Sequence, residues 1–189
     1  MYHCIPQSSH PIRDTRWDHD FHRQQAGIRL AGLSALIILL DWWTKQWASR
    51  ELTMFERVEV FSWFNLTLVH NFGAAFSFLS DAGGWQRWFL TLLAVVVTVI
   101  LLVWLLRLDK GEWLKGLSLG LLIGGAIGNL ADRIRLGYVV DFIDWHYGGW
   151  HWPAFNIADA AITCGIILLL LDAFFEAKRE KQAKAAEEH

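Results

Sequence analysis

The sequence predicts an all-α membrane protein with four transmembrane helices and a small β-rich segment outside the membrane. The first observation is composition: 54% of the 189 residues are hydrophobic, and the mean hydropathy is +0.27. An ordinary soluble domain of this length is less apolar. The second observation is a set of long apolar runs, each near the roughly 20 residues that a spanning helix needs. These runs lie at about 28–43, 88–106, 117–130 and 158–175.

The distribution of Lys and Arg predicts the orientation of these helices. Positive residues are frequent before the first run, between the second and third runs, and after the fourth. Because cytoplasmic segments carry the excess of positive charge, both termini are expected in the cytoplasm. The chain is therefore divided into a cytoplasmic polar tail (1–26), a four-helix transmembrane domain (27–176) and a cytoplasmic charged tail (177–189).

The two remaining connections, at about 46–87 and 134–154, face outward in this arrangement. In the first, Val58 and Val60 alternate with polar residues, and the alternation resumes in a shifted phase at Phe64. Such a pattern predicts two short strands or one bent strand. We expect this amphipathic segment to form a cradle that rests on the outer membrane surface. The second loop is rich in Trp and His, as interfacial segments often are.

A stripe of glycines organises the third apolar run. Glycine recurs at every fourth residue, so that one face of a helix is smooth and another helix can pack closely. The stripe ends beside three polar residues, Asn129, Asp132 and Arg133. Polar groups at membrane depth are costly and usually mark a site, but an ion pair such as Asp132 with Arg133 would also explain them. The glycines are Gly116, Gly120, Gly124 and Gly128.

Further polar residues lie near the outward ends of the predicted elements. Asp41 and Lys45 have the spacing of an intrahelical ion pair, and Asn156 and Asp159 share one face of the fourth helix. The second run carries no such residue, whereas an ion pathway would place them through the whole membrane thickness. The pattern therefore favours a site open to the outer leaflet. Its candidate members are Asp41, Lys45, Asn71, Asn129, Arg133, Asp141, Asn156 and Asp159.

Two carboxylates in one such site indicate a particular chemistry. Close together they cannot both ionise, so one can activate water while the other, protonated, polarises a carbonyl. That is peptide hydrolysis of the aspartic type. Asp144, His146 and His151 suggest a metal site, but their spacing matches no strong zinc pattern, and no metal or cofactor is expected. Cys4 and Cys164 fall at different depths, which indicates no disulfide framework.

Five blocks of residues, in their order along the chain, resemble signal peptidase II, the bacterial prolipoprotein signal peptidase. They cover about 28–175, and together they are far more specific than any one of them. The Trp42-Trp43 pair departs from the family, which often has Gln after the first Asp. The blocks are Asp41 with Thr44-Lys45, the segment 71–77 from Asn71 to Ser77, 124–133 from Gly124 to Arg133, 140–144 with Asp141, and 155–159 with Asn156 and Asp159.

The resemblance implies an aspartic endopeptidase of the bacterial inner membrane with its site near the periplasmic surface. Family members remove the signal peptide of a lipoprotein precursor after its cysteine has been diacylated, and globomycin blocks their catalytic pair. That pair corresponds to Asp141 and Asp159. The implied partners are diacylated prolipoproteins and membrane lipid, with no nucleic acid, and we expect a monomer. Site-lining residues are Asn71, Asn129, Arg133 and Asn156, and supporting residues are Asp41, Lys45, Asp132 and Gly128.

Two other classes of function remain open from the residues alone. A small proton-coupled transporter would use Asp141 and Asp159 for ion exchange, but the uniformly apolar second run counts against a polar path. A structural assembly subunit held by the glycine stripe would explain close packing. It leaves the eight outward polar residues without a role.

Overall fold

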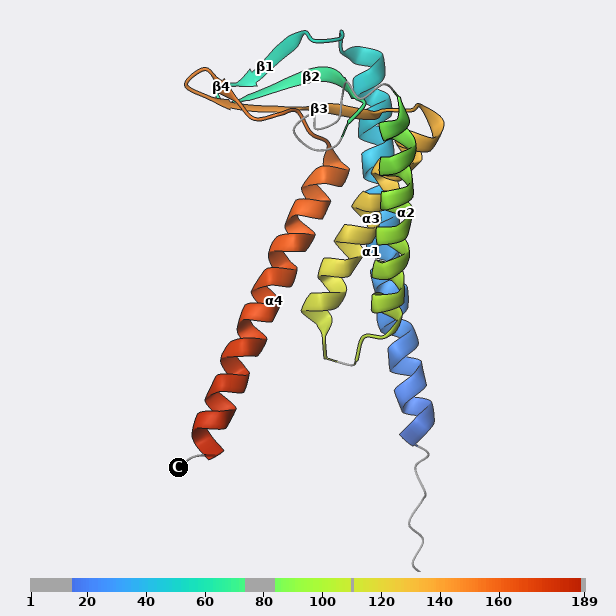
Figure 1. Cartoon of the computed structure of the whole chain (residues 1–189), viewed down its shortest axis with the longest axis vertical. Coiled ribbons are helices and arrows are strands. Elements are labelled where there is room, and N and C mark those ends of the chain that lie inside the picture. Colours follow the sequence, from blue (N-terminus) through green and yellow to red (C-terminus); the bar gives the residue numbers. More distant parts are fainter. Residues whose placement is uncertain (1–14, 74–83, 110, 188–189) are drawn as a thin grey trace, which may run out of the picture.

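The computed structural model describes residues 15–73, 84–109 and 111–187, which form four helices and one four-stranded sheet. The helices run lengthwise, and the sheet crosses the bundle at one end (Figure 1). The protein is thus mostly helical rather than all-α. The elements are α1 (Thr15–Glu51), β1 (Arg57–Phe61), β2 (Phe64–Asn71), α2 (Trp85–Leu106), α3 (Trp113–Arg135), β3 (Val139–Tyr147), β4 (Trp150–His151) and α4 (Ile157–Glu187).

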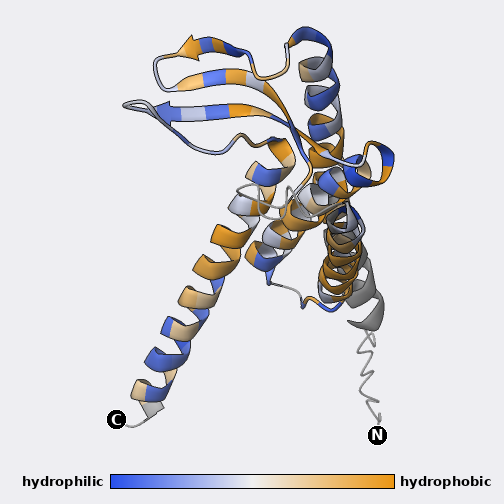
Figure 2. Cartoon of the chain, turned by 45° about the horizontal axis from the view of Figure 1, so that its top comes forward, coloured by the Kyte–Doolittle hydropathy of each residue, from blue (hydrophilic) through white to orange (hydrophobic). Residues whose placement is uncertain are grey.

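Three helices of the described chain are long and apolar enough to cross a membrane. They are Arg87–Leu106, Trp113–Arg135 and Ile157–Ala186, with mean hydropathies of 3.0, 1.4 and 2.1. Figure 2 shows the strong apolar character of α2 and the change to polar residues toward the end of α4. Helix α1 has 37 residues but does not meet the same hydropathy criterion within the described residues. The fourth span therefore stays a prediction.

The helices extend beyond the apolar runs from which they were predicted. Helix α1 begins at Thr15, inside the segment 1–26 expected as a polar tail, and α4 continues to Glu187 through most of 177–189. Helix formation continues past the apolar runs because straight-chain polar residues such as Lys, Glu and Gln propagate a helix well. Hydropathy marks the part of a helix that meets lipid, not its ends.

Helix α3 packs closely against α1 along the glycine stripe, as predicted. A Cβ atom added to Gly116 would lie 2.8 Å from Leu30 Cδ1, and one added to Gly124 would lie 2.9 Å from Ile37 Cβ. On its other side α3 packs against α4, where a Cβ on Gly125 would meet the carbonyl oxygen of Ala158. The small residues thus bring three helices together at backbone distance.

The sheet has the order β1-β2-β3-β4, with each neighbouring pair antiparallel. Strands β1 and β2 decide between the two alternatives predicted for the first connection, two short strands or one bent strand, in favour of two. Strands β3 and β4 were not predicted, although β3 has nine residues and pairs with β2 over most of its length. Its buried Val139 and Val140 follow one another, and acidic residues interrupt the remaining apolar pattern, so no clear alternation is visible in the sequence.

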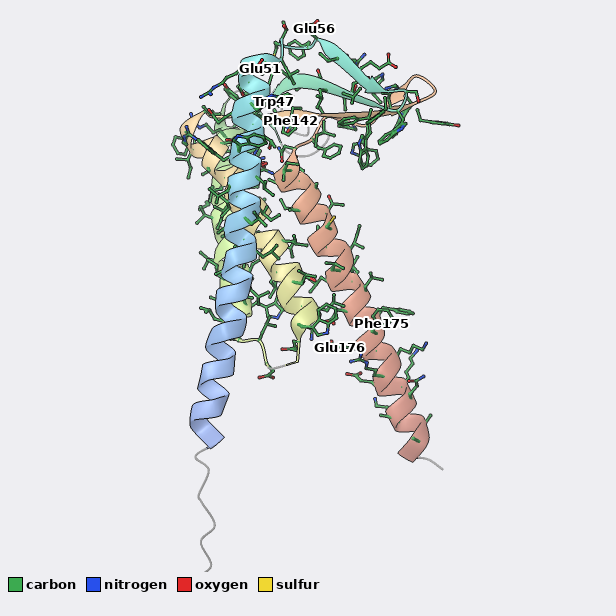
Figure 3. The ribbon with its side chains drawn as sticks, turned by 180° about the vertical axis from the view of Figure 1, so that it is seen from behind. Trp47, Glu51, Glu56, Phe142, Phe175 and Glu176 are labelled. Atoms are coloured by element: carbon green, nitrogen blue, oxygen red, sulfur yellow. The ribbon has the colours of Figure 1, made fainter. Side chains whose placement is uncertain are left out.

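The sheet fixes the end of the bundle at which the predicted site lies. Figure 3 shows Trp47 of α1 and Phe142 of β3 at the sheet end, with Phe175 and Glu176 of α4 at the opposite end. At that opposite end Lys115 of α3 forms an ion pair of 2.6 Å with Glu176. The start of α4, which carries Asp159, therefore lies next to the sheet.

The close contact between α3 and α4 predicts a large effect of a small substitution. In Gly125→Ala the new methyl group would clash with the carbonyl oxygen of Ala158 and lie 2.7 Å from Ile162 Cγ1. Overpacking of this kind costs about 1–3 kcal/mol, so the melting temperature in detergent should fall. Gly32→Ala is the matched control, because nothing lies within 4 Å of its added Cβ. Equal melting temperatures for the two variants would contradict this account of the helix contact.

Candidate active site

A buried cation joins α1 to α3 beneath the sheet. Lys45 is 1% exposed, and its Nζ lies 2.7 Å from Asp41 Oδ2 and 3.0 Å from Asp132 Oδ2. The same Nζ donates a hydrogen bond of 3.0 Å to Asn129 Oδ1. The predicted pairing of Asp41 with Lys45 is confirmed. Asp132 takes Lys45 as its ion-pair partner, whereas the sequence-based alternative had joined it to Arg133.

The two acids on either side of Lys45 also hold the backbone of the neighbouring elements. Asp41 Oδ1 accepts the N–H of Ala158 at 2.9 Å, and Asp132 Oδ2 accepts the N–H of Val140 at 3.2 Å. Each donor residue directly precedes one of the two carboxylates predicted to be catalytic. Gly128 leaves room for this arrangement, since a Cβ there would lie 2.7 Å from Asp41 Oδ2. The network therefore positions β3 and α4 relative to each other.

Asp141 and Asp159 lie on either side of Asn156. Asp141 Oδ1 accepts a hydrogen bond of 2.7 Å from Asn156 Nδ2, and its Oδ2 accepts one of 2.9 Å from Asn71 Nδ2. Asp159 Oδ1 accepts one of 2.7 Å from Asn129 Nδ2, and its Oδ2 accepts the N–H of Asn156 at 3.3 Å. Residues from β2, β3, α3 and α4 thus converge, as the outward polar pattern predicted.

The start of α4 explains how Asp159 is held. Asn156 directly precedes the helix, and its Oδ1 accepts the N–H of Asp159 at 2.9 Å while Asp159 accepts the N–H of Asn156. This reciprocal pair is a capping box, which satisfies two backbone donors at a helix start. The i,i+3 spacing of Asn156 and Asp159 in the sequence is typical of such a capping box. Asp159 therefore has a fixed side-chain direction in the first turn.

The surroundings of Asp141 favour its protonated form. Burial, followed by the negative charge of Asp159, raises the pKa of Asp141 from its ordinary value of 3.8 to about 7. The amide donors of Asn71 and Asn156, together with the charge of Lys45, lower the pKa of Asp141 in part. Two interacting carboxylates titrate as a pair, and a pKa of about 7 means that a substantial fraction of the molecules carries a proton on this pair near neutral pH.

Arg133 lies beside the pair on the last turn of α3. Its Nη2 donates to the carbonyl oxygen of Gly73 at 3.3 Å, and Gly73 in turn donates its N–H to Asn71 Oδ1 at 3.0 Å. The guanidinium attracts the charges of Asp141 and Asp159. Residues 74–77 of the predicted block 71–77 lie outside the described residues.

The sequence analysis gave no role to Arg87, which closes the end of α3. Its Nε donates to the carbonyl oxygen of Arg133 at 3.2 Å, and its Nη2 donates to that of Ile134 at 3.1 Å. Basic side chains commonly satisfy the last carbonyl groups of a helix. Because Arg87 lies in the first turn of a different helix, α2, its sequence position alone gives no indication of this contact.

Asp144 belongs to the sheet rather than to the carboxylate pair. It is buried, accepts a hydrogen bond of 3.0 Å from Asn65 Nδ2, and lies 2.9 Å from His151 Nδ1. The His151 ring stacks on that of His146. In the described ranges, no three His, Cys, Asp or Glu side chains are arranged to hold a metal ion. These residues thus link β2, β3 and β4.

Residues 33–175 match the sequence profile of the family described as signal peptidase (SPase) II. The chain belongs to this family. The lipoprotein signal peptidase of Acinetobacter baumannii is 56% identical over 155 residues, which cover 82% of this chain and 88% of the relative. That of Teredinibacter turnerae is 52% identical over 160 residues, or 85% of this chain and 95% of the relative. A signal peptidase II fold is thus expected across most of the chain.

A solved structure supports the same assignment. It is described as a bacterial membrane enzyme, is 27% identical, and aligns with a TM-score of 0.73 over 80% of this chain and 90% of that chain. Together with the apolar helices, this likeness identifies a mostly helical membrane protein. The individual roles of the site residues in this signal peptidase II chain remain predictions.

Removal of the buried cation should strongly destabilise the protein. In Lys45→Met, Asp41 and Asp132 would be left as buried carboxylates without their counter-charge, which costs about 3–5 kcal/mol. Arg57→Met is the matched control, because Arg57 is 58% exposed and lies 3.5 Å from Asp144, which keeps its other partners. That exposed pair contributes at most about 1 kcal/mol. Thermal unfolding in detergent compares the stability of Lys45→Met with that of Arg57→Met. Similar losses of stability in the two variants would contradict the proposed effect of burial.

The raised pKa of Asp141 also predicts a pH dependence of stability. Its pKa is about 7 in the folded protein and near the ordinary 3.8 in the unfolded chain. As pH rises between these values, the unfolded chain loses this proton first, so the free energy of unfolding decreases. Asp141→Asn has no such proton. Relative to the wild type, the melting temperature of the variant should therefore rise between about pH 4 and about pH 8. A constant difference would show that Asp141 titrates normally.

Proposed function

We propose that this protein is an aspartic endopeptidase that cleaves the signal peptide from diacylglyceryl-modified prolipoproteins, on the N-terminal side of the lipidated cysteine. The observation that carries this proposal is the pair Asp141 and Asp159, both hydrogen-bonded to Asn156 and both supported by further amide donors. Membership of the signal peptidase II family and the names of the relatives support the same substrate class.

In the first step the pair holds one proton. The ionised carboxylate accepts a proton from water, and the water oxygen forms a bond to the scissile carbonyl carbon. The protonated carboxyl donates its proton to the carbonyl oxygen, so that a neutral gem-diol results and no charge accumulates. The raised pKa of Asp141 keeps the required proton available near neutral pH.

In the second step the gem-diol collapses and the carbon–nitrogen bond breaks. The carboxyl that took the proton from water delivers it to the leaving nitrogen, which becomes the free amine of the lipidated cysteine. The other carboxylate recovers a proton from a hydroxyl of the gem-diol, and the signal peptide leaves with a carboxyl terminus. The pair ends in its starting protonation state, as catalysis requires.

The residues around the pair have distinct proposed roles. Asn71, Asn129 and Asn156 orient the carboxylates through their amide groups, and this orientation preorganises the site. Arg133, which donates to the Gly73 and Asn129 carbonyl oxygens, is proposed to bind a backbone carbonyl of the substrate. Lys45, together with Asp41, Asp132 and Asn129, forms the group that supports these residues.

The position of the site suits a substrate that is held in the membrane. The pair lies where α4 begins, next to the sheet, so a scissile bond beside a lipid-bearing cysteine can reach it from the outer leaflet. We therefore propose a protein of the bacterial inner membrane with both termini cytoplasmic, the site near the periplasmic surface, and the sheet as a cradle on that surface. We propose a monomer as the working unit.

Cleavage of a diacylated prolipoprotein by the purified protein tests the proposal. Asp141→Asn and Asp159→Asn keep the side-chain size but remove the titratable proton, so each should lose at least about 10³-fold in rate. Asp144→Asn is the control, because Asp144 is a buried carboxylate on the same strand that points away from the pair. Globomycin should abolish the wild-type reaction.

Circular dichroism and melting curves establish that the variants are folded. If Asp141→Asn or Asp159→Asn retained a rate near that of the wild type, the assignment of the pair would be wrong, and Asp132 would be the next carboxylate to replace. A folded wild type that never cleaves the precursor would exclude the peptidase activity itself.

A further inference from the structure

The face of the sheet that carries Asp141 is mostly apolar and becomes exposed toward the end of β3, from 2% at Asp141 to 84% at Tyr147. Side chains alternate along a strand, so Ile143, Trp145 and Tyr147 of β3 lie on the same face as Asp141. On the opposite face of β3, Phe142 and Asp144 are buried, each 4% exposed, whereas Trp145 is 51% exposed. The face of a sheet that meets water carries polar side chains, so these exposed aromatic rings indicate a different environment.

The far end of this face forms a cluster of aromatic side chains, here called the aromatic tip. Its members come from the β1–β2 turn, from the end of β3, and from β4 and the residue directly after β4. They line an open groove of about 350 Å³, with His146 as the remaining lining residue. Asp141 and Asp159 are not part of this groove. The aromatic tip consists of Trp63, Trp145, Tyr147, Trp150 and Trp152.

The aromatic tip projects beyond the helices. Both Figure 1 and Figure 3 show that the β3–β4 end of the sheet extends past the start of α4, on the side away from the other helices. Below it, the surface of α4 is apolar and exposed, with Ile166 at 47% and Leu170 at 66%. Lipid that surrounds α4 therefore continues to the level of the aromatic tip.

We infer that the aromatic tip packs into the interfacial layer of the outer leaflet. Trp and Tyr favour this layer, because their rings are apolar and their N–H and O–H groups reach water or lipid carbonyls. An apolar cluster of this size is rarely left in water. The aromatic tip also contacts the segment that leads into α4, since the ring centroids of Trp145 and Phe155 lie 5.1 Å apart.

The lipid contact would hold the catalytic strand at a constant depth. Asp141 and Tyr147 are both in β3, six residues and thus about 20 Å apart along a rigid, paired strand. If the Tyr147 end of β3 is fixed in the headgroup layer, the Asp141 end moves less along the membrane normal. This consequence for cleavage rests on the proposed function, whereas the lipid contact itself does not.

A spin label at the aromatic tip tests the contact directly. Tyr147→Cys, in a Cys4→Ser and Cys164→Ala background, places the label at a side chain that is 84% exposed, so folding should be preserved. Glu59→Cys is the matched control: Glu59 is exposed on β1 and pairs with Asn65, on the opposite face of the same sheet. Power-saturation electron paramagnetic resonance is recorded on the full chain in vesicles of phosphatidylethanolamine and phosphatidylglycerol.

The inference expects greater accessibility to oxygen at position 147 and to a water-soluble nickel chelate at position 59. Greater nickel accessibility at both positions would place the aromatic tip in water and overturn the inference. Protection from both reagents at position 147 would indicate a protein surface, such as a second copy of the chain, and would also overturn it. Greater oxygen accessibility at both positions would exclude a contact specific to one face.

A second measurement tests the consequence for cleavage. The double substitution Trp150→Ala with Trp152→Ala should reduce the cleavage rate severalfold in vesicles but leave it nearly unchanged in detergent micelles, which adapt to the altered surface. An equal loss in both media would show that these residues act through the structure of the sheet and would overturn the role in setting depth. If the wild type does not cleave at all, the proposed function fails, while the spin-label result still decides the lipid contact.

Discussion

The arrangement of the site depends on one buried ammonium group placed between two carboxylates. Lys45 neutralises Asp41 and Asp132, and these acids accept the backbone N–H groups that precede Asp159 and Asp141. Three charges inside an apolar bundle are stable only if each is paired and hydrogen-bonded. The same contacts that satisfy the charges therefore fix where a strand and a helix meet. The geometry of the proposed site and the compensation of its buried charges have a single structural cause in this region.

The features that were predicted from the sequence are those with local spacing. The glycine stripe, the Asp41–Lys45 pair and the Asn156–Asp159 pair all follow from helical periodicity, and the structure contains each of them. Strand β3 was missed because its buried Val139 and Val140 are adjacent and obscure alternation. The ion-pair partner of Asp132, for which Arg133 was one alternative, is Lys45. Lys45 lies 87 positions away, by 132 − 45, and contacts that distant leave no trace in a single sequence.

The carboxylate pair combines two opposing influences. Burial and mutual repulsion favour protonation, as the pKa of about 7 for Asp141 shows, while amide donors on both acids favour ionisation. Neither influence alone suits acid–base chemistry, because a fully protonated pair has no base and a fully ionised pair has no acid. Three asparagines achieve the balance without adding charge. Neutral amides suit the proposed acid–base role, since an additional cation would lower the pKa of Asp141 and favour loss of the proton that the proposed mechanism needs.

The i,i+4 spacing of Asp41 and Lys45 has a consequence for biosynthesis. The first helix emerges from the ribosome before α3 and α4 exist, so neither Asp132 nor Asn129 can yet accept from Lys45. In the predicted four-span arrangement, the opposite charges one turn apart let α1 enter the bilayer as a locally neutral segment, which reduces the cost of inserting an isolated lysine. Asp132 arrives later, on a helix whose glycines admit α1 at close range. The order of synthesis and the order of charge pairing are thus the same.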